Sequence, residues 1–152
     1  MSVNESKKPV GGVVCAKLYL ARDIDSIENL PQAKSIEVEL KDDGSTYEEA
    51  FVKDDGLVSV EHTLTLHSEP SLSKEWFSVE LMQILSTEGA VAEVVLASGE
   101  ELILGYSERF GLEQALRLES LKFHSGSRPN DSPSVVLRLQ SRDLRSALSE
   151  NI

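Results

Sequence analysis

The amino-acid sequence predicts a mainly β (α+β) protein, an antiparallel β-sandwich or barrel of about eight strands with one helix. Three observations lead to this prediction. Apolar and polar residues alternate with a period of two in several segments, and Asp-Gly or Ser-Gly turns separate those segments. A helical period occurs in one convincing place. The alternation of strands and helices that marks a parallel sheet is missing from the pattern.

The composition fits one globular domain. The chain has 152 residues, of which 40% are hydrophobic and 27% are charged, and this length is enough to bury a substantial core. We expect a flexible N-terminal tail over residues 1–12, a single β-rich domain over residues 13–143 and a polar C-terminal tail over residues 144–152. We find no secretory signal and no membrane-spanning run, so we expect a protein made in the cytoplasm with no membrane partner.

The chain contains one cysteine, Cys15, and so has no second thiol for an internal disulfide. A single unpaired cysteine suits a reducing compartment. Cys15 lies inside the apolar run VVCAKLYL, which is rich in β-branched and large apolar residues and predicts a strand over Val13–Leu20. We predict that Cys15 is a small core residue rather than a reactive thiol.

The net charge of −11 comes from 26 acidic and 15 basic residues. This balance disfavours direct nucleic-acid recognition, because phosphates attract clustered lysine and arginine. Acidic residues dominate the middle of the chain. Basic residues gather towards its end, at Arg109, Arg117, Lys122, Arg128, Arg138, Arg142 and Arg145. One interpretation is a head-to-tail contact between copies, with Arg109 and Arg117 as candidate interface residues, and the other is an ordinary mixed surface.

The segment Ser35–Ser68 shows the clearest β pattern. It follows the irregular run ARDIDSIENLPQAK, which a proline closes and which has room for one helical turn at most. SIEVEL, YEEAFV and LVSVEHTLTLHS then alternate apolar and polar residues, with KDDG between them. We predict a three-stranded antiparallel meander with one face exposed to solvent. In its last strand four residues share the inward face, namely Val58, Val60, Leu64 and Leu66.

The tetrapeptide KDDG occurs twice, beginning at Lys41 and at Lys53. A calcium loop needs several converging oxygen ligands and a distal glutamate, and neither copy has that spacing. Asp-Gly is common in tight turns, because glycine accepts the positive φ angle that they require. Both copies are therefore predicted to be turns.

A helical period replaces the alternation after the meander. Four apolar residues fall on one helical face, namely Phe77, Leu81, Ile84 and Leu85. We predict a helix over Ser73–Ser86, with Ser73 capping its start and Gly89 just beyond its end. The alternative is a strand through WFSVEL. Trp76 would lie in the first helical turn and pack on a sheet.

Two further strand pairs are predicted after the helix. AVAEVVLA is apolar at nearly every position, so we expect Val91–Ala97 to be buried on both faces and to pair with ELILGY through a Ser-Gly turn. In LRLESLKF, Leu116 and Leu118 share one face of a regular strand, whereas Leu121 and Phe123 share the other. One extra residue between the two pairs would bring both to the core side, which predicts a β-bulge near Glu119 and Ser120. The final strand, SVVLRLQS, directs three side chains inward, namely Val135, Leu137 and Leu139.

The stretch FHSGSRPNDSPSVVLRL combines residue types that hydrolases use. His124, Ser125 and Asp131 occur together, but neighbouring side chains in an extended segment point apart, and the chain has no Gly-x-Ser-x-Gly elbow. Glycine, proline, asparagine and aspartate here are typical of a turn. We predict a long connection that serves contacts with other molecules. Its candidate interface residues are Phe123, His124, Arg128, Asn130 and Asp131.

No metal, cofactor or catalytic motif is evident. His62 and His67 are five residues apart on a predicted strand, so they point to opposite faces and cannot share a metal. The sequence has no Cys-x-x-Cys or His-x-x-x-His pair, no phosphate-binding loop and no dinucleotide-binding glycine motif. We predict a protein that is not an enzyme and that binds no cofactor.

The order of a meander, one helix and an apolar hairpin, followed by ILGYSERFGLEQALRLESLKFHSGSRPNDSPSVVLRLQSRD, resembles small structural proteins of phage tails and related contractile injection machines. The pattern extends over about Gly12 to Asp143, and its last part looks like tail-region proteins of Bacteroidetes phages or prophages. This resemblance implies a barrel or sandwich subunit that joins a ring, often sixfold, through sheet edges and long loops. The implied partners are copies of the chain and other tail-type structural proteins, in a virion or injection particle.

The same resemblance implies no catalytic residue, because this kind of structural protein has none to assign to the chain. Tube proteins of this kind often line a lumen with acidic charge, which would suit the net charge of −11. This chain lacks a long apolar extension for reaching a neighbour, which favours an accessory or tail-completion role over a tube role. The alternative function is a β-sandwich binding module for a carbohydrate or peptide, using residues 123–133 with Trp76 or Tyr106. Aromatic residues make up only 5% of the chain, whereas a carbohydrate platform needs several exposed ones.

Overall fold

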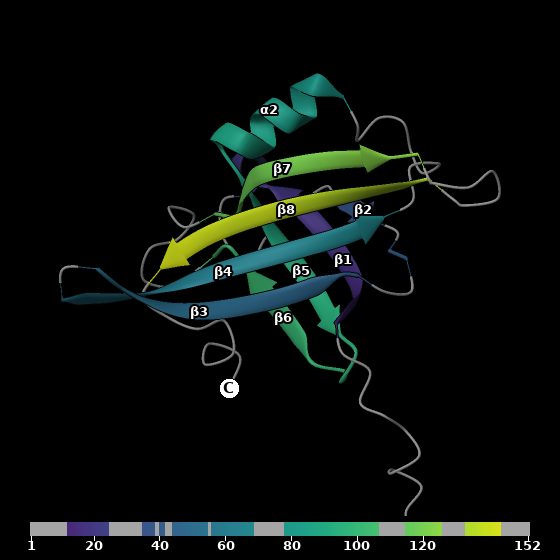
Figure 1. The fold of residues 1–152 in the computed structure, drawn as a ribbon. Helices are drawn as coiled ribbons and strands as arrows, with labels where there is room; N and C mark the ends of the chain where they lie inside the picture. The colour runs from purple at the N-terminus through teal and green to yellow at the C-terminus, as the bar shows by residue number, and fades with distance from the viewer. Residues whose placement is uncertain are drawn as a thin grey trace, which may run out of the picture.

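A computed structural model of the chain describes residues 12–24, 35–38, 40–41, 44–54, 56–68, 78–106, 115–125 and 133–143. Eight strands form two four-stranded antiparallel sheets, and the described residues contain one α-helix and one 3-10 turn. The prediction of a mainly β fold is therefore confirmed (Figure 1). The predicted C-terminal tail, residues 144–152, lies outside the described residues, as do residues 1–11 of the predicted N-terminal tail over residues 1–12. Gly12 is described, and its carbonyl oxygen accepts a hydrogen bond from the amide of Ala97 at 2.9 Å.

The first sheet has the strand order β2-β1-β5-β6. Its strands are β1 (Val13–Leu20), β2 (Ile36–Val38), β5 (Ala90–Leu96) and β6 (Glu101–Leu104), and the turn η1 (Ala21–Asp23) follows β1. The second sheet has the order β3-β4-β8-β7. Its strands are β3 (Thr46–Asp54), β4 (Leu57–Ser68), β7 (Arg117–His124) and β8 (Ser134–Asp143), and the helix is α2 (Val79–Thr87).

The main core lies between the two sheets. Leu18 and Val94 come from the first sheet, Leu64 and Leu137 from the second, and none of these is more than 1% exposed. Period-two alternation produces this arrangement, because every second side chain of a strand points to the same face. The predicted inward residues Val135, Leu137 and Leu139 are all buried, as are Val60, Leu64 and Leu66 of β4.

The predicted three-stranded meander is wrong in its first strand. β2 pairs with β1 in the first sheet, whereas β3 and β4 form a hairpin in the second. Beyond β2, Leu40 makes an isolated bridge to Ser68 at the end of β4, so this stretch passes from one sheet to the other. Alternation shows that one face of a strand is buried, but it does not show which sheet the strand joins.

The second KDDG forms the predicted hairpin turn. Asp54 pairs with Leu57, which leaves a two-residue connection, and its Gly56 has φ +85°. The first KDDG does not connect neighbouring strands of one sheet, because it lies between β2 and β3. Its two aspartates, residues 42 and 43, are outside the described residues.

The predicted β-bulge in β7 is confirmed. Leu118 pairs with Leu139 and Ser120 with Arg138, so Glu119 is the extra residue. Leu118 and Leu121 consequently both pack against the main core. The same shift directs Phe123 towards the inner face, opposite Val135.

The helix begins later than predicted. Ser78 has an extended backbone, and its hydroxyl oxygen accepts a hydrogen bond from the amide of Leu81 at 3.1 Å, so Ser78 is the N-cap. The predicted start at Ser73 is therefore wrong, and residues 71–77 lie outside the described residues. The predicted apolar face is confirmed for Leu81, which packs on the core, and for Leu85, which is fully buried.

The prediction for Cys15 is also wrong, because its side chain is exposed. The pairing of β1 with β5 shifts register between Val13 and Cys15, and this irregularity leaves Val14 50% exposed. Cys15 then lies opposite Val95, one position before the core residue Ala16. An apolar run does not reveal which of its members an irregular strand turns outward.

A second, smaller core covers the other face of the first sheet. Tyr19, Ile24 and Val91 are buried there, and Ile103 and Tyr106 pack against them. The first half of β5 is therefore buried on both faces, as predicted, while its last residues are only partly buried. The Tyr19 hydroxyl donates a hydrogen bond to Glu93 at 3.4 Å. Burial raises the pKa of Tyr19 above its usual value, and the Glu93 carboxylate adds to the shift.

We expect the free energy of unfolding to fall as the pH rises above about 10, where an unfolded tyrosine loses its proton. The raised pKa of Tyr19 means that the folded state holds this proton more tightly, so its contribution is complete below that pH and is lost above it. Urea unfolding at about pH 8 and about pH 11 measures the loss. Tyr19→Phe should show a smaller loss than the wild type; an equal loss would contradict the assignment.

Candidate functional site

The β3–β4 hairpin projects beyond the rest of the second sheet. The described pairing of β4 with β8 ends at Val60 and Asp143, whereas the pairing of β3 with β4 continues to Asp54 and Leu57. Figure 1 shows the hairpin at the left, extending past the arrowhead of β8. A short length of two-stranded ribbon therefore extends past the sandwich.

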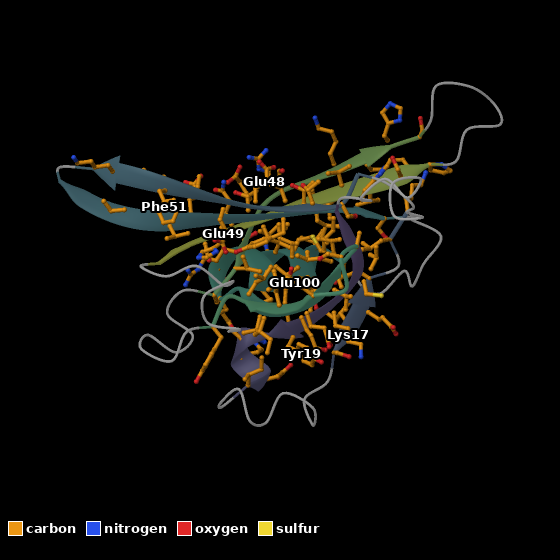
Figure 2. All side chains as sticks on the ribbon, turned by 90° about the horizontal axis from the view of Figure 1, so that it is seen from below. Lys17, Tyr19, Glu48, Glu49, Phe51 and Glu100 are labelled. Atoms are coloured by element: carbon orange, nitrogen blue, oxygen red, sulfur yellow. The ribbon has the colours of Figure 1, made fainter. Side chains whose placement is uncertain are left out.

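Large apolar side chains are exposed on the inner face of this projecting part. Near the body of the protein that face is covered, and Val60 is only 2% exposed. Further out, Phe51 is 75% exposed and Val58 is 53% exposed. Phe51, which Figure 2 labels, is paired with Val60. Val58 is the next inward residue of β4 towards the turn, so Phe51 and Val58 are diagonal neighbours on the same face.

A buried polar cluster lies at the base of the hairpin. The Tyr47 hydroxyl donates a hydrogen bond to the Glu49 carboxylate and lies 2.6 Å from His62 Nδ1. The imidazole nitrogen is 3.6 Å from Glu49 Oε2, and the rings of Tyr47 and His62 stack with centroids 6.1 Å apart. His62 is 4% exposed. The cluster gives buried polar groups hydrogen-bond partners and so holds β3 against β4 where the hairpin leaves the sandwich.

This cluster does not form a nucleophile–base pair. Ser141 lies opposite His62 on β8, and its buried hydroxyl makes no hydrogen bond within the described part of the chain. A serine nucleophile needs a hydrogen bond to its general base and access for a substrate. The arrangement therefore fits a structural cluster better than a reaction centre.

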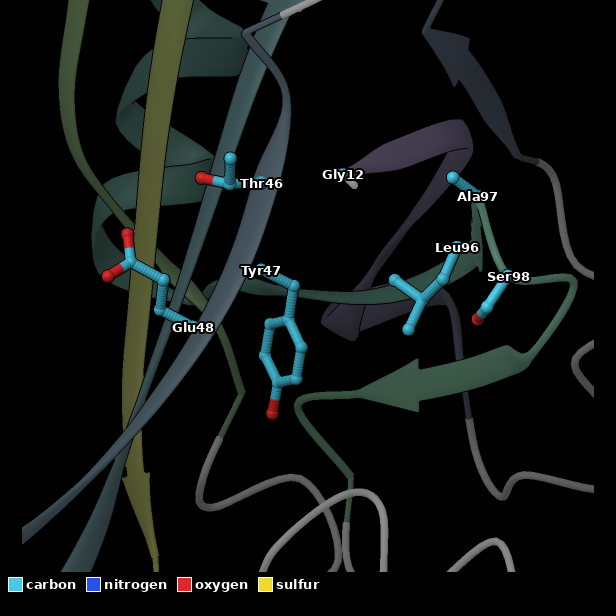
Figure 3. A pocket seen from close by; sticks show the side chains of 7 residues that line it. All are labelled: Gly12, Thr46, Tyr47, Glu48, Leu96, Ala97 and Ser98. Carbon is cyan, nitrogen blue, oxygen red and sulfur yellow. The ribbon is translucent and has the colours of Figure 1, made fainter. Parts of the chain in front are cut away.

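A shallow hollow of about 320 Å³ lies beside the start of β3. Its lining residues are Gly12, Thr46, Tyr47, Glu48, Leu96, Ala97 and Ser98 (Figure 3). Most of these contribute backbone or small side chains, and Tyr47 supplies the one aromatic ring among them. The hollow offers little of the converging polar chemistry that orients a small ligand.

The residues predicted for an interface are separated in the structure. Phe123 is 59% exposed, and His124 is also exposed, at the end of β7. Arg117 lies at the opposite end of that strand, where its Nε donates a hydrogen bond to the Thr87 carbonyl at 3.2 Å. The remaining candidates, Arg109, Arg128, Asn130 and Asp131, lie outside the described residues, as does Trp76.

Sequence reasoning missed the hairpin surface. Val58 was expected to be buried, because it shares the inward parity of β4, and Phe51 carried no expectation of exposure. The one sequence feature that could have indicated it is Phe51, an aromatic residue a few positions before an Asp-Gly turn. An aromatic residue there indicates an exposed apolar surface only when the hairpin is known to project beyond the opposite sheet.

The outer face of the second sheet separates its charges. Glu48 and Glu61 lie on β3 and β4, and Figure 2 shows Glu48 on the opposite side of the ribbon from Glu49. Arg117, Lys122 and Arg138 lie on β7 and β8, although Arg138 Nε is 3.5 Å from Glu119. One half of this face is therefore acidic and the other is mainly basic.

Neither a metal centre nor a membrane segment emerges from the described residues. They contain no group of three or more histidine, cysteine, aspartate or glutamate residues that could hold a metal ion. Among them, no helix combines the length and apolar character needed to cross a bilayer. Comparison with known proteins found no matching family model, no matching curated protein and no matching solved structure.

Proposed function

We propose that this protein is a non-enzymatic structural subunit that assembles with copies of itself. The observation that carries this proposal is the exposed pair of Phe51 and Val58 on a projecting hairpin. Contiguous exposed apolar side chains on a soluble protein mark an interaction surface. Burying one phenylalanine side chain contributes about 1.5–3 kcal/mol, so covering this pair favours association appreciably.

The edges of the second sheet support the same proposal. β3 has nine residues, and among the described strands it pairs with β4 alone. A long outer strand is an aggregation hazard in a monomer unless it is covered or paired. The charges of the sheet also differ between its β3 and β7 sides. A head-to-tail contact would bring Glu48 of one copy towards Lys122 of the next.

Such an assembly agrees with the role implied by the resemblance to phage-tail and injection-machine proteins. Contacts between unlike surfaces close into a ring when the rotation between copies allows it. We propose a ring-forming tail or tail-tube-like subunit whose further partners are other structural proteins of the same particle. Its final location would then be a virion or injection particle.

The alternative proposal is a binding module for a carbohydrate or peptide. The hollow beside β3 is the feature that favours it, since the Tyr47 ring lies in its lining. The Tyr47 hydroxyl is already bonded to Glu49, however, and carbohydrate platforms use several exposed aromatic faces. The hairpin surface therefore gives the assembly proposal the stronger support.

We expect the wild-type mass in solution to rise above the chain mass of 16.7 kDa as the concentration increases. The double variant Phe51→Ser with Val58→Ser should remain at 16.7 kDa, because its hairpin no longer offers apolar area to a partner. Light scattering across a concentration series measures both. Val14→Ser is the matched control, because Val14 is 50% exposed on the other sheet and should leave association unchanged.

Two results would count against this function. A wild-type protein that stays at 16.7 kDa up to about millimolar concentration would have no measurable self-association, since that affinity corresponds to only about 4 kcal/mol. Association of the hairpin variant equal to that of the wild type would place the interface elsewhere. In the first case, binding measurements with a panel of glycans and peptides would test the alternative.

A further inference from the structure

We draw no further inference here: the strongest candidate, the exposed apolar surface of Phe51 and Val58 on the inner face of the projecting β3–β4 hairpin, already carries the proposed function, and nothing in the described part of the structure shows what covers it.

Discussion

Replacing Leu64 with alanine is expected to lower the free energy of unfolding by about 2–5 kcal/mol. Leu64 is fully buried in the middle of β4, where it pairs with Tyr47 on one side and Leu139 on the other. Its side chain fills space between two sheets, and hydrogen-bonded sheets cannot collapse easily into the cavity that alanine would leave. Urea unfolding followed by circular dichroism measures the change.

The matched control is Val14→Ala, because Val14 is a strand residue that is 50% exposed. Its loss should be below about 1 kcal/mol, as little packing is removed. A loss below about 1 kcal/mol for Leu64→Ala as well would mean that the sheets close over the cavity, and it would contradict a core packed between two rigid layers.

The second large effect is expected for Gly89→Ala, which should cost about 2–4 kcal/mol. Gly89 has φ +84°, and an added Cβ would lie 2.6 Å from the Leu116 carbonyl oxygen. The following residue, Ala90, exchanges two backbone hydrogen bonds with Leu116, at 2.8 and 2.9 Å. This bridge ties the start of β5 to the segment that enters β7, so the substitution disturbs a junction between the sheets.

Gly99→Ala separates the cost of the positive φ angle from the cost of the steric contact with the Leu116 carbonyl oxygen. Gly99 has φ +98°, but an added Cβ there would meet nothing within 4 Å. Its cost is therefore that of the left-handed backbone alone, about 1–2 kcal/mol. Parallel urea titrations should show a greater loss for Gly89→Ala. Equal losses would show that the Ala90–Leu116 bridge shifts without cost.

The local features of this fold could be predicted from the sequence, because they depend on neighbouring residues. Alternation identified the buried faces of β4 and β8. The Asp-Gly pair that ends at Gly56 identified the tight hairpin, since glycine accepts the positive φ angle there. A change of parity between Leu118 and Leu121 located the bulge at Glu119. In each case the turn chemistry or the side-chain period is written in a few consecutive residues.

The candidate site was predicted only in part, for a related reason. Phe123 and His124 were expected at an interface, and the structure exposes both. Arg117 was expected to act with them, but it lies at the other end of β7. A strand separates its residues by about 3.3 Å each, so positions grouped by sequence order need not form one surface.

Tertiary structure alone decided which sheet each strand joins and where an inward face is left uncovered. Residues 36–38 alternate like a member of the meander, yet they pair with β1, because pairing depends on a distant partner. Val58 has the same inward parity as Leu64, but at its position the hairpin has passed the end of the sandwich. For β4 and β8 the sequence by itself determined which side chains point inward, because their alternation is regular; the lengths of the facing strands determined which of those side chains are buried and which remain free to contact another molecule.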